Sequence, residues 1–136
     1  MPIVVNVVSE DEYAQWLSSK QAEAAQIKEL MAQTFTMDEL MERGKAVYER
    51  NCLACHGANG EGGVGTAIAG SAIASGDVGG HLNVGVNGVP GTAMQAFGGQ
   101  LNDVDMAAVI TYQRNAFGNN MGDMIQPIDV FNYKKG

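Results

Sequence analysis

Apolar side chains in the first part of the chain recur every three or four residues, which is the spacing of one face of an α-helix. Ser9 and Glu12 stand just before this stripe, in the Ser-x-x-Glu arrangement of a capping box. The pattern therefore predicts a helix from residue 9 to about residue 33. Its apolar face consists of Tyr13, Trp16, Leu17, Ala24, Ile27 and Met31.

The residues before this helix, Met-Pro-Ile-Val-Val-Asn-Val-Val, are rich in β-branched side chains and predict a short strand over residues 1–8. The rest of the chain offers no second strand, so this strand is an orphan edge that was cut from a β domain or that pairs with another copy. The helical stripe packs either on its own domain or on a neighbouring one. The orphan strand favours the neighbour, and the isolated chain is then expected to self-associate.

A second capping box, Thr36-Met37-Asp38-Glu39, predicts a helix that ends near Asn51. Gly44, Tyr48 and Cys52 are spaced by four residues and therefore share one face of this segment. A glycine on that face allows another helix to approach closely, and the tyrosine fills the space beside it.

A last helix is predicted after Asn102, which is a good N-cap and is followed by Asp103 and Asp105 in the first turn. Its interior is mostly apolar, and Gly118 is a good C-terminal stop. The polar tail from residue 119 is expected to lie on the surface or to fray. All of the longer elements are helices, so the fold class predicted is all-α.

The middle of the chain is rich in glycine: fourteen of the eighteen glycines fall between Gly57 and Gly99. Such a segment is too flexible to build an ordered core from its own side chains. It is therefore either disordered or folded around something large and apolar. Short helical turns are expected at residues 68–75 and 81–87.

Charge argues against one class of function. The 136 residues carry a net charge of −7 and no basic cluster, which disfavours nucleic-acid binding. No apolar run is long enough to cross a bilayer, and no signal peptide is written in the sequence.

Candidate chemistry is concentrated in Cys52-Leu53-Ala54-Cys55-His56, which has the Cys-x-x-Cys-His signature of c-type haem attachment. The two thiols lie about one helical turn apart and can both form thioethers to one porphyrin, while the histidine reaches the iron from one face. Zinc binding and dithiol redox chemistry are the alternatives. A structural zinc site needs four ligands, and only His81 is left to complete one. The redox alternative expects a βαβ context, which is absent.

A haem that transfers electrons needs a second axial ligand, and eight methionines compete for this role. Met94 lies in a loop after the glycine-rich segment, from which it can return to the opposite haem face. Met106 lies inside the last helix, where a core role is favoured. His81 is the rival ligand, although a surface or hydrogen-bonded role is the favoured interpretation for it.

Three stretches resemble a known family. They are Gly44-x-x-x-Tyr48-x-x-x-Cys52-x-x-Cys55-His56, Pro90-Gly91-Thr92-Ala93-Met94-x-Ala96-Phe97 and Val109-Ile110-Thr111-Tyr112-Gln113-Arg114-Asn115. Together they resemble a class I cytochrome c domain, and more narrowly the cytochrome c domain at the C-terminus of subunit II in caa3-type cytochrome c oxidases. The segments 114–119 and 125–127 strengthen the narrower match. Residues 1–5 are similar to the end of the subunit II copper domain, where a methionine before Pro-Ile-Val is a copper ligand.

The resemblance implies a small all-α fold around one covalent haem c, preceded by an extra helix and the orphan strand. It divides the chain into a strand remnant of a copper domain (1–8), a linker helix (9–34), the cytochrome c domain (35–126) and a C-terminal tail (127–136). Cys52 and Cys55 would attach the haem, and His56 and Met94 would ligate its iron. The first and last helices of the domain would cross near Val109 and Tyr112.

Three departures from the family pattern matter. The family usually has a proline whose carbonyl accepts a hydrogen bond from the proximal histidine; Thr66 stands near that place, which leaves the partner of His56 open. Gln95 replaces a common proline beside Met94 and is expected to loosen that ligand. Met1 alone cannot bind copper, so no copper is expected in this fragment.

The expected function is one-electron transfer by a haem with histidine and methionine ligands, without chemistry of its own. The resemblance implies that electrons come from a quinol-oxidising complex or a small cytochrome and pass to the copper centre of the parent oxidase. It also implies a soluble domain at the periplasmic face of a bacterial inner membrane, so that a signal or anchor would lie outside this chain. A free-standing monohaem carrier and a haem sensor with a labile sixth ligand are the alternatives.

Overall fold

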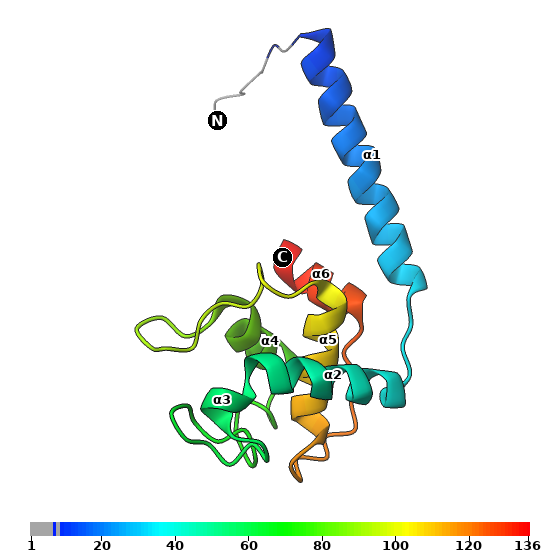
Figure 1. The fold of residues 1–136 in the computed structure, drawn as a ribbon. Helices are drawn as coiled ribbons and strands as arrows, with labels where there is room; N and C mark the ends of the chain where they lie inside the picture. The colour runs from blue at the N-terminus through cyan, green and yellow to red at the C-terminus, as the bar shows by residue number, and fades with distance from the viewer. Residues whose placement is uncertain (1–6, 8) are drawn as a thin grey trace. The chain divides into compact units, whose positions relative to one another are not determined.

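The computed structural model of the chain describes residue 7 and residues 9–136, and every regular element among them is a helix. The helices, shown in Figure 1, are α1 (Glu10–Ala32), α2 (Met37–Asn51), α3 (Leu53–His56), α4 (Val78–Asn87), α5 (Asp103–Asn115) and α6 (Pro127–Lys135). The all-α prediction is thus confirmed. The chain forms two compact units, which are divided after Ala32. None of the described helices combines the length and apolar character that a membrane span needs.

Helix α1 makes up nearly all of the described part of the first unit. The Ser9 side chain accepts a hydrogen bond from the Glu12 N–H at 3.2 Å, so the helix begins where the capping box predicts. Tyr13 and Trp16 stack with ring centroids 6.0 Å apart, and each is 54% exposed. The strand predicted over residues 1–8 lies outside the described residues except for Val7, so it stays a prediction.

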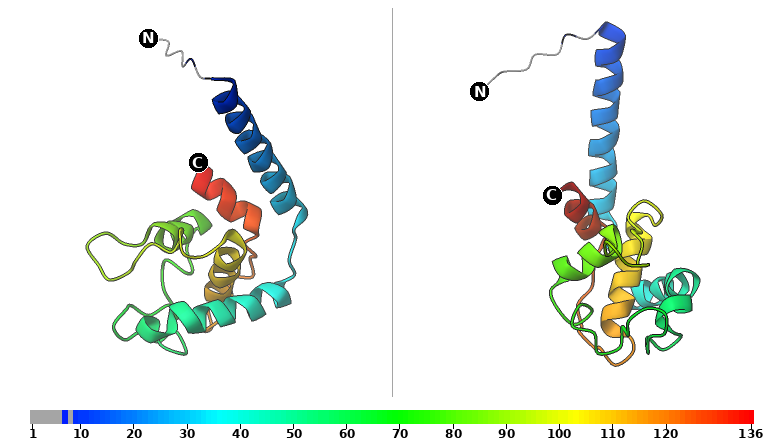
Figure 2. Two further views of the ribbon diagram at one scale, coloured as in Figure 1. Left: turned by 45° about the horizontal axis from the view of Figure 1, so that its top comes forward. Right: turned by 90° about the vertical axis from the view of Figure 1, so that its left-hand side faces the viewer.

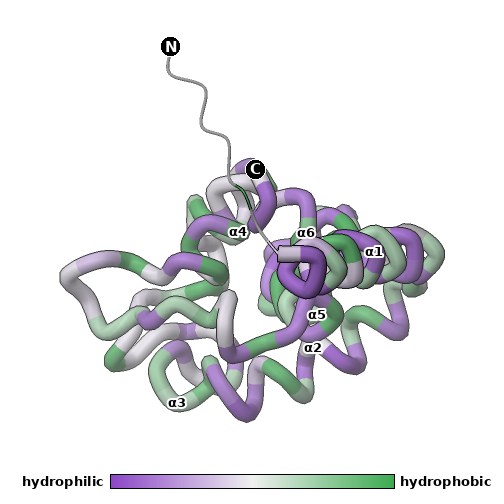
Figure 3. The backbone as a smooth tube through the Cα atoms, turned by 90° about the horizontal axis from the view of Figure 1, so that it is seen from above, coloured by the Kyte–Doolittle hydropathy of each residue, from purple (hydrophilic) through white to green (hydrophobic). Residues whose placement is uncertain are grey.

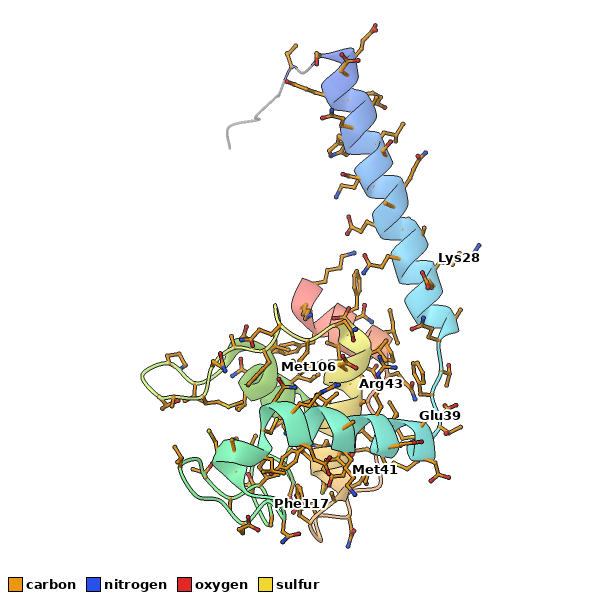
Figure 4. All side chains as sticks on the ribbon, in the orientation of Figure 1. Lys28, Glu39, Met41, Arg43, Met106 and Phe117 are labelled. Atoms are coloured by element: carbon orange, nitrogen blue, oxygen red, sulfur yellow. The ribbon has the colours of Figure 1, made fainter. Side chains whose placement is uncertain are left out.

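The second unit is built on the crossing of α2 and α5, which the views in Figures 1 and 2 show from three directions. The Thr36 capping box begins α2 as predicted, with hydrogen bonds in both directions between Thr36 and Glu39. Gly44 lies directly against the backbone of Ala108 and the side chain of Tyr112, because it has no Cβ to hold them away. The exposed end of the crossing carries an ion pair between Arg43 and Asp105 at 2.7 Å; Arg43 is labelled in Figure 4.

The C-terminal tail forms a helix, which corrects the expectation that it would lie on the surface or fray. Gln126 caps α6, and Pro127 occupies its first turn, where a missing N–H costs nothing. Val130 of α6 is fully buried, and α6 packs against α5. The Gln126 side-chain amide also accepts from the Phe35 N–H at 2.9 Å and donates to the Phe35 carbonyl at 3.0 Å.

Loops make up most of the chain between α3 and α5, and Figure 3 shows them largely in pale and green tones rather than purple. Ser71 holds a turn by accepting from the N–H groups of Ile73 and Ala74, within the region where a helical turn was expected. Helix α4 begins at residue 78, three residues earlier than expected, because the Asp77 carboxylate accepts from the Gly80 N–H at 2.7 Å and caps it. These loops and α4 form much of the wall of a cavity in the second unit.

Candidate haem site

The second unit contains a cavity of about 430 Å³, and all four predicted site residues line it. Cys52, Cys55 and His56 contribute from the end of α2 and from α3, while Met94 contributes from the loop after α4. A volume of this size lies in the range of small-molecule sites. The remaining walls are Asn51, Val64, Gly65, Thr66, Ala67, Ile68, Ser71, Ile73, Ala74, His81, Val84, Gly85, Val89, Thr92, Ala93, Gln95, Phe97, Leu101, Met106, Val109, Ile110 and Gln113.

The two cysteines differ in exposure. Cys52 is buried at the junction of α2 and α3, and Cys55 is exposed one turn later; both are free thiols. Burial, together with the neighbouring Cys55, raises the pKa of Cys52 to about 11. Dithiol redox sites depend on a lowered thiol pKa. The environment of Cys52 therefore disfavours the redox alternative.

His56 is oriented by a backbone carbonyl. Its Nδ1 lies 2.6 Å from the carbonyl oxygen of Thr66, so the ring donates its Nδ1 proton there and keeps Nε2 for a metal. Gly65 allows this approach, because a Cβ at that position would lie 3.0 Å from His56 Cε1. The hydrogen-bond partner of His56, which the sequence left open, is therefore the backbone carbonyl of Thr66.

Met94 is half-buried in a loop that is closed by hydrogen bonds between residues close together in the sequence. Its carbonyl accepts from the Val89 N–H at 3.0 Å, and its own N–H donates to Thr92 Oγ1 at 3.2 Å. Gly88, with φ +68°, lies directly against the Met94 carbonyl and leaves no room for a side chain. These contacts hold the loop around Met94 in place even though Gln95 stands where a proline is common.

The other methionines occupy different surroundings. Met106, labelled in Figure 4, is 1% exposed on α5, and its sulfur lies 3.3 Å from the position that a Cβ of Gly85 would occupy. It also borders the cavity, but as part of the packed wall between α4 and α5. Met121 and Met124 are exposed on the segment before α6. Met94 is thus distinguished from Met106 by its place in a loop, and from Met121 and Met124 because it lines the cavity and they do not.

His81 is hydrogen-bonded, as favoured, but it is not on the surface. It is 4% exposed on α4, and its Nε2 lies 2.7 Å from Gln113 Oε1 on α5. Gln113 Nε2 in turn lies 3.9 Å from Cys52 Sγ. Burial, reinforced by the positive charge of Arg114, lowers the pKa of His81. Nothing in the sequence indicated this role of Gln113, because a lone amide within a helix has no characteristic motif.

Arg114 is a second residue whose role the sequence did not indicate. It is 2% exposed, its guanidinium pairs with Asp123 at 2.8 Å, and it donates to the Gly76 carbonyl at 2.8 Å. It thereby connects α5 with two separate loops of the unit.

The cavity fits a haem. Its described lining contains no Asp, Glu, Lys or Arg, which suits the apolar face of a porphyrin, and the four predicted residues supply two thiols, an imidazole and a thioether. Among residues 7 and 9–136, no group of three or more His, Cys, Asp or Glu side chains converges as a metal-binding cluster, which leaves the zinc alternative without a ligand set there. A haem bound in this cavity would supply one-electron Fe(II)/Fe(III) chemistry.

An all-helical unit that surrounds an apolar cavity with a Cys-x-x-Cys-His motif in its wall defines a cytochrome c domain. Such a domain binds haem c and works in haem-based electron transfer. The chain belongs to the family described as cytochrome c oxidase, cbb3-type, subunit III, whose model matches residues 39–112, from α2 into α5. No curated protein matches the chain.

Proposed function

We propose that this domain carries one electron on a single haem c, which Cys52 and Cys55 attach covalently and which His56 and Met94 ligate from opposite faces. The observation that carries the proposal is that these four side chains, from two separate segments of the chain, line one uncharged cavity. Two fixed axial ligands allow the iron to change oxidation state with little rearrangement, and a soft thioether favours ferrous iron.

The residues of the chain do the positioning. The carbonyl of Thr66 holds the His56 ring so that Nε2 is the nitrogen presented to the iron. The hydrogen bonds from Val89 and to Thr92 fix the backbone of Met94.

Spectroscopy of the holoprotein tests the ligand assignment. The ferric protein should show the weak methionine-to-iron absorption band, and Met94→Ala should abolish it. Met124→Ala is the matched control, because Met124 is 47% exposed and does not line the cavity. A band that survives Met94→Ala would overturn the assignment. Rapid binding of carbon monoxide to the reduced wild-type protein would favour the haem-sensor alternative.

For the electron acceptor we propose the copper centre of a haem–copper oxidase, reached while the domain is a soluble part of a membrane-anchored subunit on the periplasmic side of a bacterial inner membrane. The family to which the chain belongs is described as an oxidase subunit, which supports this assignment. The narrower resemblance to subunit II of caa3-type oxidases supports copper as the acceptor. Electrons would come from a quinol-oxidising complex or a small cytochrome.

The rim of the cavity indicates how such a partner would dock. Val64, Ile73 and Val89 line the cavity and are 85%, 46% and 38% exposed, and no charged residue is among the described lining. Electron-transfer contacts are small and short-lived. An uncharged apolar rim therefore favours docking that depends little on salt, despite the net charge of −7.

Stopped-flow transfer from the reduced protein to an isolated copper domain of a caa3-type subunit II tests this part of the proposal. The rate should change less than about threefold between 20 and 300 mM salt, as expected where no charged groups meet. Val64→Lys should slow transfer, whereas Met121→Lys, at an exposed methionine outside the cavity lining, should not. Equal slowing by both variants, or a steep dependence on salt, would count against the docking site.

We further propose that α1 is a linker whose exposed Tyr13 and Trp16 pack on a neighbouring domain of the parent subunit. In the isolated chain the same rings would then drive self-association. Sedimentation should show concentration-dependent dimers that Trp16→Glu removes. A monomer at every concentration would contradict this proposal and leave the haem assignment untouched.

A further inference from the structure

His81 is unusual among the residues around the cavity. The ionisable side chains of the described lining are Cys52, Cys55, His56 and His81. If the cysteines form thioethers and His56 ligates the iron, as proposed, only His81 keeps the ability to take up a proton. It is 4% exposed, so any charge that it gains would be poorly screened from the haem.

The hydrogen bonds of His81 define which atom would take that proton. Its Nε2 lies 2.7 Å from Gln113 Oε1, and an amide oxygen only accepts, so Nε2 carries the proton of the neutral ring. Its Nδ1 is buried and has no partner among the residues that the structure describes. The neutral ring therefore has a free basic nitrogen at Nδ1, beside the cavity.

We propose that His81 is a redox-linked proton site, whose Nδ1 binds a proton more tightly when the haem is ferrous than when it is ferric. This inference rests on the haem-based electron transfer proposed above. The donor supplies the electron that converts ferric to ferrous iron, and solvent supplies the proton that converts the neutral imidazole to imidazolium. No other bond forms or breaks.

The sign follows from electrostatics. Ferric haem carries one more positive charge than ferrous haem, so it opposes a cation on His81 more strongly. Two charged groups act on the ring in either state: Arg114 on α5 opposes protonation and Asp123 favours it. Asp77 is the N-cap of the helix that carries His81. Burial and Arg114 lower the pKa of His81 below its ordinary value of 6.5, which places the effect on the acid side of neutrality.

Lower pH should therefore raise the reduction potential, and the potential should level off once His81 is neutral in both states. If reduction makes proton binding about tenfold tighter, the two plateaus differ by about 59 mV for a one-electron couple. The electron-transfer driving force of the domain would then respond to acidification.

Potentiometric titration of the holoprotein between pH 4.5 and 8 tests the inference. His81→Gln keeps an N–H donor for Gln113 but cannot take up a proton, so its profile should lose the step. Asp77→Asn is the matched control: it removes a charge from the same helix while keeping a good N-cap, and its step should persist. A full step in His81→Gln would assign it to the haem propionates and overturn the inference.

Nuclear magnetic resonance gives an answer that needs no variant. The chain has two histidines, so the imidazole signals are those of His56 and His81. The pKa of His81 should be higher in the ferrous than in the ferric protein, by the amount that the step in the reduction potential gives, and equal values would overturn the inference. A protein that binds haem but shows equal values refutes only the proton site. A protein that binds no haem refutes the proposed function as well.

Discussion

The crossing of α2 and α5 and the loops between residues 57 and 101 are built on opposite principles. At the crossing, fully buried side chains interlock, and Gly44 brings α2 against the backbone of Ala108. In the loops, backbone groups bond to one another: the N–H groups of Gly62 and Gly65 reach the carbonyls of His56 and Cys55 at 2.8 Å. The structure of the crossing depends on side-chain volume. The structure of the loops depends on backbone conformation and on the haem that they are proposed to surround.

The difference decides which changes damage each region. The crossing should lose stability when even one atom is added, because a closely packed interior has no space for it. The loops should tolerate new side chains at many open positions but depend on the few links that connect them to the helices. Four changes test this contrast, beginning with the one expected to have the largest effect.

Gly44→Val should cost about 3 kcal/mol of unfolding free energy or more, because the new Cβ would overlap the Ala108 carbonyl and the Tyr112 side chain. Denaturant unfolding of the holoprotein measures this cost. Gly99→Ala is the control in the loops, since nothing lies within 4 Å of its added Cβ; it should change stability by less than about 0.5 kcal/mol. Similar losses in both variants would remove the distinction between the regions.

Asp123→Ala should cost about 3 kcal/mol, because it leaves the Arg114 guanidinium buried without its carboxylate. The Gly76 carbonyl accepts from the same guanidinium, so the backbone amides of the loop around Gly76 should exchange their hydrogens faster. Arg43→Ala breaks an ion pair of similar length, but with Arg43 47% exposed, and should cost less than about 1 kcal/mol. Equal costs would show that burial does not govern these pairs.

Tyr48→Phe should cost about 1 kcal/mol, because it removes the 2.7 Å hydrogen bond from the tyrosine hydroxyl to the Gly57 carbonyl. Burial, the largest cause, raises the pKa of Tyr48 to about 12, so folding favours the neutral phenol. The resulting stability is complete below pH 10, the ordinary pKa, and is lost as the pH rises through 12. The wild type should therefore lose stability faster than Tyr48→Phe over this interval, and parallel curves would refute the assignment.

Thr66→Pro should have the smallest effect, below about 1 kcal/mol in either direction. The carbonyl that orients His56 is kept, and the Thr66 N–H has no hydrogen-bond acceptor among the described residues. The haem spectrum should be unchanged. A shifted spectrum would show that the loop conformation, and not only the carbonyl, sets the orientation of His56.

Much of the helical fold was predictable because capping residues stand where helices begin. The side chains of Ser9, Thr36 and Asn102 each accept the N–H hydrogen bond expected of an N-cap. Helix α6 was missed because the polar composition of residues 119–136 outweighed a shorter signal: Pro127 in the first turn and one buried Val130. The start of α4 was missed because Asp77 lies within a glycine-rich run that masks helical periodicity.

The candidate site divides in the same way. The Cys-x-x-Cys-His spacing predicted three of the cavity residues, and loop placement predicted Met94; the structure brings all four to one cavity. It left the partner of His56 open, since a backbone carbonyl such as that of Thr66 has no side-chain signature. It also could not pair His81 with Gln113, because their contact joins α4 to α5 across 32 positions of the chain.

The two hydrogen bonds between Gln126 and the Phe35 backbone have a mechanical consequence. These hydrogen bonds lie at Phe35, one residue before the N-cap of α2 at Thr36. A force applied to the chain at residue 33 would therefore act on them and, through Gln126, on the start of α6. Force is thereby divided between two helices that both pack on α5, before it reaches the loops around the cavity. The segment that carries Met94 is therefore expected to be strained last when the chain is pulled from its N-terminal side.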